Sequence, residues 1–198
     1  MSGNTPNPKQ KRQTLLIYLA IVVLCFVFYG NSIKNYYSMD DDLVTTTYDY
    51  PTEDPDDRVL ISRHKNVEMG IAGIPTIFRS RFVENAKQSY AYRPVTTSVF
   101  AIEYQFFGSN PHVSHFWNIL LYAVVVILVF KLIRMALPRA GLALPIIVSA
   151  LFLVHPLHSE VVNNIKSRDE ILCLMFGLLS MIHILRFFDS KKKLWFIT

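Results

Sequence analysis

The sequence has few of the residues that mark a small disulfide-rich or zinc-binding domain. Its 198 residues contain two cysteines, Cys25 and Cys173, and both lie inside apolar runs. Two isolated cysteines exclude a disulfide framework and provide no zinc-ligand spacing. We therefore expect each cysteine to act as a small hydrophobe within its apolar run.

Charge is also sparse for a chain of this length. Charged residues make up 18% of the sequence and hydrophobic residues 52%, and the mean hydropathy is +0.29. This composition is too apolar for a soluble globular domain and is typical of a membrane protein. The net charge of +5 forms no single patch, because the Lys and Arg residues stand in short groups at the ends of apolar runs. We therefore expect no nucleic-acid partner.

Four apolar segments predict an all-α polytopic membrane protein. The expected spans are residues 14–30, 112–133, 140–155 and 170–186, followed by the start of a fifth at 194–198. The first two are long enough to cross a hydrocarbon layer of about 30 Å at about 1.5 Å per residue. Asn110 and Pro111 predict the start of the second helix, as a cap and a first-turn proline.

The distribution of basic residues predicts the orientation of these spans. Clusters of Lys and Arg mark three connecting segments, in which Asp189 is the only acid: residues 1–13, 134–139 and 187–193. By the positive-inside bias these segments are cytoplasmic, in a bacterial inner membrane or the endoplasmic reticulum membrane. The loops 31–111 and 156–169 then share the opposite, extracytoplasmic face. The longer loop becomes apolar and aromatic after Val67, which predicts interfacial helices.

The stretch NYYSMDDDLVTT places three carboxylates just after the first span. Adjacent carboxylates can separate in pKa, so that Asp40 or Asp41 acts as a base while the other binds or orients a group. A solvated acidic turn is the alternative.

A second polar stretch, HPLHSEVVNNIKSRDE, covers residues 155–170. His155, His158 and Glu160 are residue types that bind metals, but Pro156 interrupts helical continuity between them. We expect no metal and no other cofactor here. A zinc site built from these three residues remains a third functional hypothesis.

Recognition of an anionic group suits the same stretch better. Imidazoles with Lys166 and Arg168 at a membrane face could hold a phosphate, and arginine has the matching geometry. Arg93, in YAYRPVTT, is a further phosphate ligand or a headgroup anchor. The alternative is an interfacial loop with helix-capping histidines and snorkelling cations.

Taken together, these motifs resemble a known family. The order MDDDLVTT, YRPVTTSVFAIEYQFFGSNPHVSHFWNILLY and LFLVHPLHSEVVNNIKSRDEIL is similar to the N-terminal part of the transmembrane-and-TPR-containing O-mannosyltransferases. These resemble the wider class of polyprenyl-phosphate-sugar-dependent glycosyltransferases of the GT-C fold. The resemblance covers the chain from about Leu16 to Phe188 and implies a partial GT-C-like helical bundle.

The resemblance implies roles for individual residues. It makes Asp40, ahead of Asp41, the general base or acceptor-orienting group, with Asp42 a neighbour that the pattern does not require. Other motif residues are expected to line the pocket for sugar and lipid phosphate: Arg93, His155, His158, Glu160, Arg168, Asp169 and Glu170. The implied reaction transfers a sugar from a polyprenyl-phosphate donor to an acceptor hydroxyl, on protein Ser or Thr, by one inverting displacement.

The sequence also departs from this family. Its members have more spans and TPR repeats, whereas no period of about 34 residues is present in this chain. A fragment, a truncated reading frame and one subunit of a split enzyme all remain open, with a missing C-terminal part or second subunit as partner. The functional alternative is a non-catalytic membrane subunit that binds a partner through its extracytoplasmic loop.

Overall fold

A computed structural model describes residues 7–38, 41, 65–80, 83–84, 89–90 and 92–190 of the chain. The chain divides into two compact units, and each is described by itself. The first comprises Met1–Gly30, Ile119–Glu160 and Cys173–Thr198, and the second comprises Asn31–Asn118 and Val161–Leu172. Asp40, Asp42 and the expected start of a fifth span lie outside the described residues.

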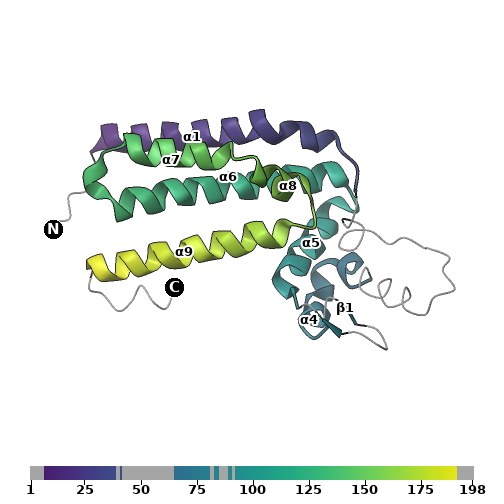
Figure 1. Cartoon of the computed structure of the whole chain (residues 1–198). Coiled ribbons are helices and arrows are strands. Elements are labelled where there is room, and N and C mark those ends of the chain that lie inside the picture. Colours follow the sequence, from purple (N-terminus) through teal and green to yellow (C-terminus); the bar gives the residue numbers. More distant parts are fainter. Residues whose placement is uncertain are drawn as a thin grey trace. The chain divides into compact units, whose positions relative to one another are not determined.

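Helices account for nearly all of the described elements (Figure 1). In chain order the elements are α1 Pro8–Tyr29, η1 Gly30–Lys34, η3 Gly70–Gly73, α4 Ile74–Ile77, β1 Val83–Glu84, β2 Ser89–Tyr90, α5 Pro94–Phe107, α6 Pro111–Ala136, η4 Pro138–Ala140, α7 Ala143–Leu153, α8 Leu157–Asn163 and α9 Arg168–Ser190. The two strands pair antiparallel over two residues each, with Val83 opposite Tyr90. The predicted all-α polytopic fold is confirmed, with this short strand pair as its single addition in the described ranges.

Three described helices are long and apolar enough to cross a membrane. They are Pro8–Lys34, Pro111–Ala136 and Arg168–Phe188, and the bent pair α7 and α8 gives a fourth if it counts as one span. The chain is therefore a multi-pass membrane protein by the length and composition of its helices. The second span begins as the sequence predicts, because the Asn110 side chain accepts from the backbone amide of His112 at 3.1 Å.

The segment expected as the third span, residues 140–155, is only partly a straight helix. Helix α7 has 11 residues, which is roughly 17 Å and too short to cross the hydrocarbon layer. The chain bends by 66° into α8, and Pro156 stands at the bend. Proline lacks an amide and disfavours helical geometry at the preceding residue, here His155. Part of the expected loop 156–169 is thus helical.

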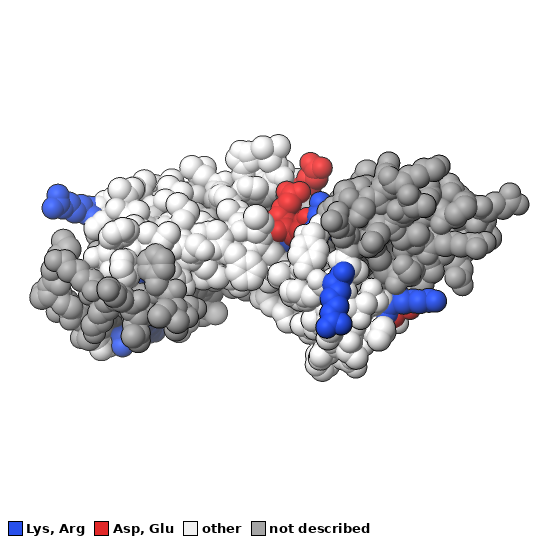
Figure 2. Space-filling model, turned by 90° about the horizontal axis from the view of Figure 1, so that it is seen from below, with Lys and Arg blue, Asp and Glu red and all other residues white. Residues whose placement is uncertain are grey.

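In the first unit, aromatic and small apolar side chains join α1, α6 and α7. Tyr18 packs edge-on against Phe130 with ring centroids 5.9 Å apart, and Cys25 is fully buried. Cys173, on α9, is exposed instead. Many large apolar side chains of α1, such as Val27, instead face outward. Figure 2 shows an almost uncharged surface over this unit, as a face in contact with lipid requires.

Two tyrosines satisfy the last carbonyl groups of α7. The Tyr29 hydroxyl donates to the carbonyl of Leu153 at 2.7 Å, and the Tyr122 hydroxyl donates to the carbonyl of Phe152 at 3.0 Å. The final carbonyls of a helix have no partner within it, so these contacts hold the end of α7 against α1 and α6.

The second unit has a smaller core around α5. Val67, Phe100 and Ile165 are buried together, and Tyr37 and Tyr104 pack against them. Gly70, at φ 61°, makes the turn into η3, and a side chain there would clash with Gln105 of α5. The turn therefore needs glycine both for its backbone conformation and for its close approach to α5.

We expect Tyr29→Phe to lower the free energy of unfolding by about 1 kcal/mol, because it removes one hydrogen bond to a buried carbonyl and keeps the ring. Thermal unfolding in detergent measures the effect. Tyr18→Phe is the matched control, since Tyr18 contributes a ring contact to the same helix pair. Equal melting temperatures for the two variants would contradict the role assigned to the Tyr29 hydroxyl.

Candidate functional site

The second unit brings together Asp41 of the acidic stretch and residues of the segment IKSRDE, residues 165–170. Asp41 is fully buried, and its Oδ1 accepts from the backbone amide of Lys166 at 2.9 Å. Its Oδ2 accepts from the backbone amide of Ser38 at 3.1 Å. The carboxylate therefore fastens the segment after α1 to the segment before α9, two stretches more than a hundred residues apart in sequence.

Arg168 and Asp41 are the two fully buried charged residues in the described part of the chain. For Arg168 the burial is offset by several contacts. Its Nη1 pairs with Glu103 Oε2 at 2.6 Å. Nε donates to Asn118 at 2.7 Å and Nη2 to the carbonyl of Ser114 at 2.9 Å. The guanidinium also lies over the Phe100 ring, 4.2 Å from its centroid. A phosphate could reach this guanidinium only by displacing these partners, and direct phosphate binding by Arg168 stays a prediction.

Glu103 is a member of this network that was not predicted from the sequence. It is 8% exposed and accepts hydrogen bonds from Arg168 and from the Ser114 hydroxyl. The available signal was a lone carboxylate within the apolar α5 sequence VFAIEYQFF, because an isolated buried charge needs an ion-pair partner. Ser114 and Asn118, which also accept hydrogen bonds from Arg168, were not predicted from the sequence either.

Arg93 and Asp169 form a second ion pair, between the N-terminus of α5 and the first turn of α9. Arg93 Nη1 lies 2.5 Å from Asp169 Oδ2, and the two side chains are 39% and 22% exposed. Both residues were expected to line a substrate pocket. Both side chains are partly exposed to solvent, unlike that of Arg168.

The two expected histidines belong to the first unit, at the bend between α7 and α8. His158 Nδ1 lies 2.7 Å from the carbonyl oxygen of Phe152 and 2.8 Å from the Tyr122 hydroxyl. Because a carbonyl can only accept, Nδ1 carries the proton, and Nε2 of the neutral ring is left as an acceptor. His155 has the opposite arrangement: its Nδ1 accepts from the amide of Leu157 at 3.3 Å.

Glu160 is exposed in the first turn of α8. Within the ranges that the structure describes, no three His, Cys, Asp or Glu side chains converge as metal ligands, and the trio His155, His158 and Glu160 is included in that finding. The zinc hypothesis for these three residues therefore has no support from their geometry.

His115 is a further buried group beside this network. Its ring has no exposed surface, and neither nitrogen has a regular hydrogen bond within the described residues, although the backbone of Tyr36 interacts with it. Asp41 and Arg168 also act on it electrostatically. The structure therefore buries a histidine within the first turns of α6.

These contacts define a class of protein: a multi-pass membrane protein that gathers acidic and basic motif residues around the start of one span. Curated protein O-mannosyl-transferases match the chain and confirm the resemblance seen in the motifs. Human TMTC3 is 28% identical over 117 residues, covering 57% of this chain and 12% of the relative. Caenorhabditis elegans F38B6.6 is 34% identical over 108 residues, covering 53% and 15%.

Human TMTC4 is 33% identical over 130 residues, which cover 58% of this chain and 17% of that protein. This chain thus spans less than a fifth of the length of each of these three relatives. No protein-family model matches it, and no solved structure is significantly similar to it.

We expect Glu103→Gln to lower the free energy of unfolding by about 3 kcal/mol, because it leaves the buried Arg168 charge uncompensated. Thermal unfolding in detergent and the abundance of protein in the membrane report the loss. Glu170→Gln, on the exposed side of the first turn of α9, is the control and is expected to change stability by less than about 0.5 kcal/mol. A Glu103→Gln protein as stable as this control would show that the ion pair is dispensable.

Proposed function

We propose that this chain forms part of a membrane glycosyltransferase that transfers a sugar, mannose by analogy with the names of its relatives, to a protein hydroxyl. The donor is a polyprenyl-phosphate-linked sugar, and the reaction takes place on the extracytoplasmic face. A base removes the proton from the acceptor hydroxyl, the oxygen attacks the anomeric carbon, and the bond to the lipid phosphate breaks. A single displacement of this kind inverts the anomeric configuration.

The observation that carries the proposal is that residues of three motifs, the same motifs that carry the resemblance, contact one another. Asp41 accepts from Lys166, and Arg93 pairs with Asp169, so residues of MDDDL, YRP and IKSRDE contact one another within one unit. The similarity to named protein O-mannosyl-transferases supports the same class of reaction.

Within this proposal Asp40 and Asp41 have different roles. Both oxygens of Asp41 accept backbone amides, which makes it a positioning residue. Asp40, directly before it in the chain, is the proposed general base for the acceptor hydroxyl.

Arg93 and Arg168 also have different roles in this proposal. Arg93 is the proposed ligand of the donor phosphate, because its partly exposed guanidinium is oriented by Asp169 and can share its donors with a phosphate. Arg168 holds α5, α6 and α9 together from the inside and acts through the residues that it positions.

The first test compares the three adjacent aspartates. We expect Asp40→Asn to abolish sugar transfer in membranes that contain the full protein, while insertion and abundance stay normal, because the amide cannot accept the proton. Asp42→Asn is the matched control and is expected to keep transfer within about twofold. Asp41→Asn is expected to lower abundance and transfer together, because the amide NH₂ cannot accept a backbone amide. Undiminished transfer by the Asp40→Asn protein would contradict the proposal.

The second test concerns the phosphate. Arg93→Gln is expected to raise the KM for the lipid-linked donor about tenfold, the effect of one lost charge-assisted hydrogen bond, with a smaller fall in kcat. Steady-state kinetics with a defined polyprenyl-phosphate sugar separates the two. Arg79→Gln removes a charge from an exposed position in the same loop and serves as the control. A donor KM equal in both variants would remove Arg93 from the donor site.

A further inference from the structure

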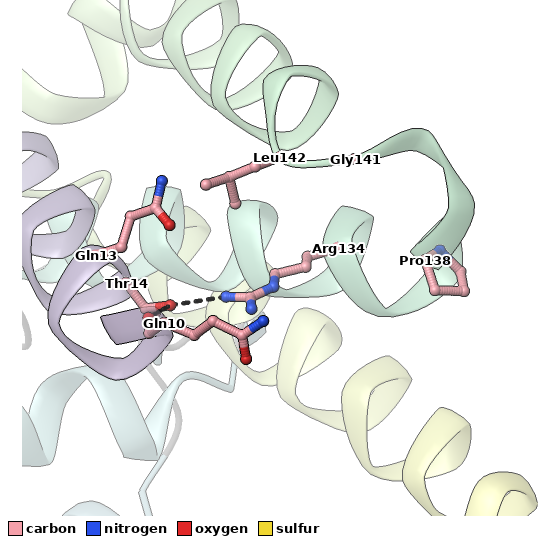
Figure 3. Close-up of a pocket in the computed structure, with 7 residues that line it drawn as sticks. All are labelled: Gln10, Gln13, Thr14, Arg134, Pro138, Gly141 and Leu142. Carbon is pink, nitrogen blue, oxygen red and sulfur yellow. Dashed lines mark hydrogen bonds between the residues drawn. The ribbon is translucent and has the colours of Figure 1, made fainter. Parts of the chain in front are cut away.

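The first unit contains a pocket that the proposed reaction does not use. It has a volume of about 360 Å³ and is lined by Gln10, Gln13, Thr14, Arg134, Pro138, Gly141 and Leu142. Figure 3 shows these residues on the first turns of α1, the last turn of α6 and the segment that leads into α7, with the side chains of Gln10, Thr14 and Arg134 close together. Ser114 and Asn118 of the candidate site lie at the opposite, N-terminal end of α6, so this is a separate place on that helix.

Arg134 gives the pocket its charge. The side chain is half-buried, and its Nη1 donates to the Thr14 hydroxyl at 2.8 Å, as the dashed line in Figure 3 shows. A guanidinium has five N–H donors, and among the described residues this is the one hydrogen bond that it makes. The contact fixes its orientation and leaves further donors for a ligand. An arginine held in this way is pre-organised for the oxygens of a phosphate.

The other lining residues favour an anion as well. The seven include no acid, and the amides of Gln10 and Gln13 can both donate. Gln10 also belongs to the capping box of α1 with Asn7, which holds it in place. Leu142, at the start of α7, has no side-chain cap, and positive helix-dipole ends of α1 and α7 both lie at this pocket.

The setting indicates an amphipathic ligand. The pocket lies where α1 begins and α6 ends. The ends of membrane spans lie near the phosphate plane of a bilayer, so we place the pocket at that depth. Leu142 and Pro138 add apolar surface to the polar floor. Lys9, Lys11 and Arg139 are exposed on the adjoining segments and would attract an anionic headgroup.

We propose that this pocket binds the phosphate headgroup of an anionic membrane lipid, with Arg134 as the principal ligand and Gln10 and Gln13 as further donors. The site holds a structural or regulatory lipid at the leaflet that faces the start of α1, which the sequence predicts to be cytoplasmic. It involves none of the residues assigned to sugar transfer, so it stands whether or not the proposed reaction is correct.

Native mass spectrometry of the delipidated full chain tests this site. The probes are phosphatidic acid, phosphatidylcholine with the same acyl chains, and inorganic phosphate. We expect a phosphatidic acid adduct that is at least about tenfold more populated than the phosphatidylcholine adduct. Arg134→Gln should reduce it about tenfold, through loss of the charge-assisted contacts. Arg139→Gln, which removes the same charge from an exposed position five residues away, should change it less than about twofold.

A second variant keeps the test valid if the Arg134→Gln protein misfolds. Gln13→Glu keeps the guanidinium and places a carboxylate in the pocket, and we expect a comparable loss of adduct with an unchanged melting temperature. Three results would overturn the proposal: equal losses in Arg134→Gln and Arg139→Gln, equal adducts with the two lipids, or binding of inorganic phosphate without any lipid adduct.

Discussion

A fully buried guanidinium, that of Arg168, is the constraint on which the second unit depends. Removing such a charge from water costs several kcal/mol, and the cost is offset only when every donor finds a partner in good geometry. Glu103, Asn118 and the carbonyl of Ser114 each accept one hydrogen bond, so that Nη1, Nε and Nη2 of Arg168 all have a partner. They belong to α5 and to the first two turns of α6, so the first residue of α9 cannot be satisfied unless these helix ends come together.

The residues next to Arg168 in the sequence make the other contacts of the candidate site. Two residues earlier, the amide of Lys166 is held by Asp41, and one residue later Asp169 is paired with Arg93. Three segments that are remote in sequence thus meet on four consecutive residues at the start of a membrane span. A reaction between a lipid-linked phosphate sugar and a hydroxyl needs acidic and basic groups at this depth, and the ion pair keeps them there without touching substrate itself.

Hydropathy and charge in the sequence predicted the spans and the polar motifs, because both are local properties. The Asn110 cap followed from the same local reasoning. The burial of Arg168 could not be predicted in this way, since it depends on Glu103, 65 residues away. Pro156 indicated an interruption of the helix, but the hydrogen bonds of Tyr29 and Tyr122 to the end of α7 join residues that are remote in sequence and could not be predicted locally. Asp40, the first choice for a base, stays a prediction.

The central claim, that Arg168 and Glu103 hold the motif segments together as a pair, is tested most directly by a double-mutant cycle. Glu103→Leu and Arg168→Met are made singly and together, and the free energy of unfolding is measured in detergent for all four proteins. We predict that each single change is severe, that the double variant recovers much of the loss, and that the coupling energy is at least about 2 kcal/mol. Single effects that add to within about 0.5 kcal/mol would contradict the claim.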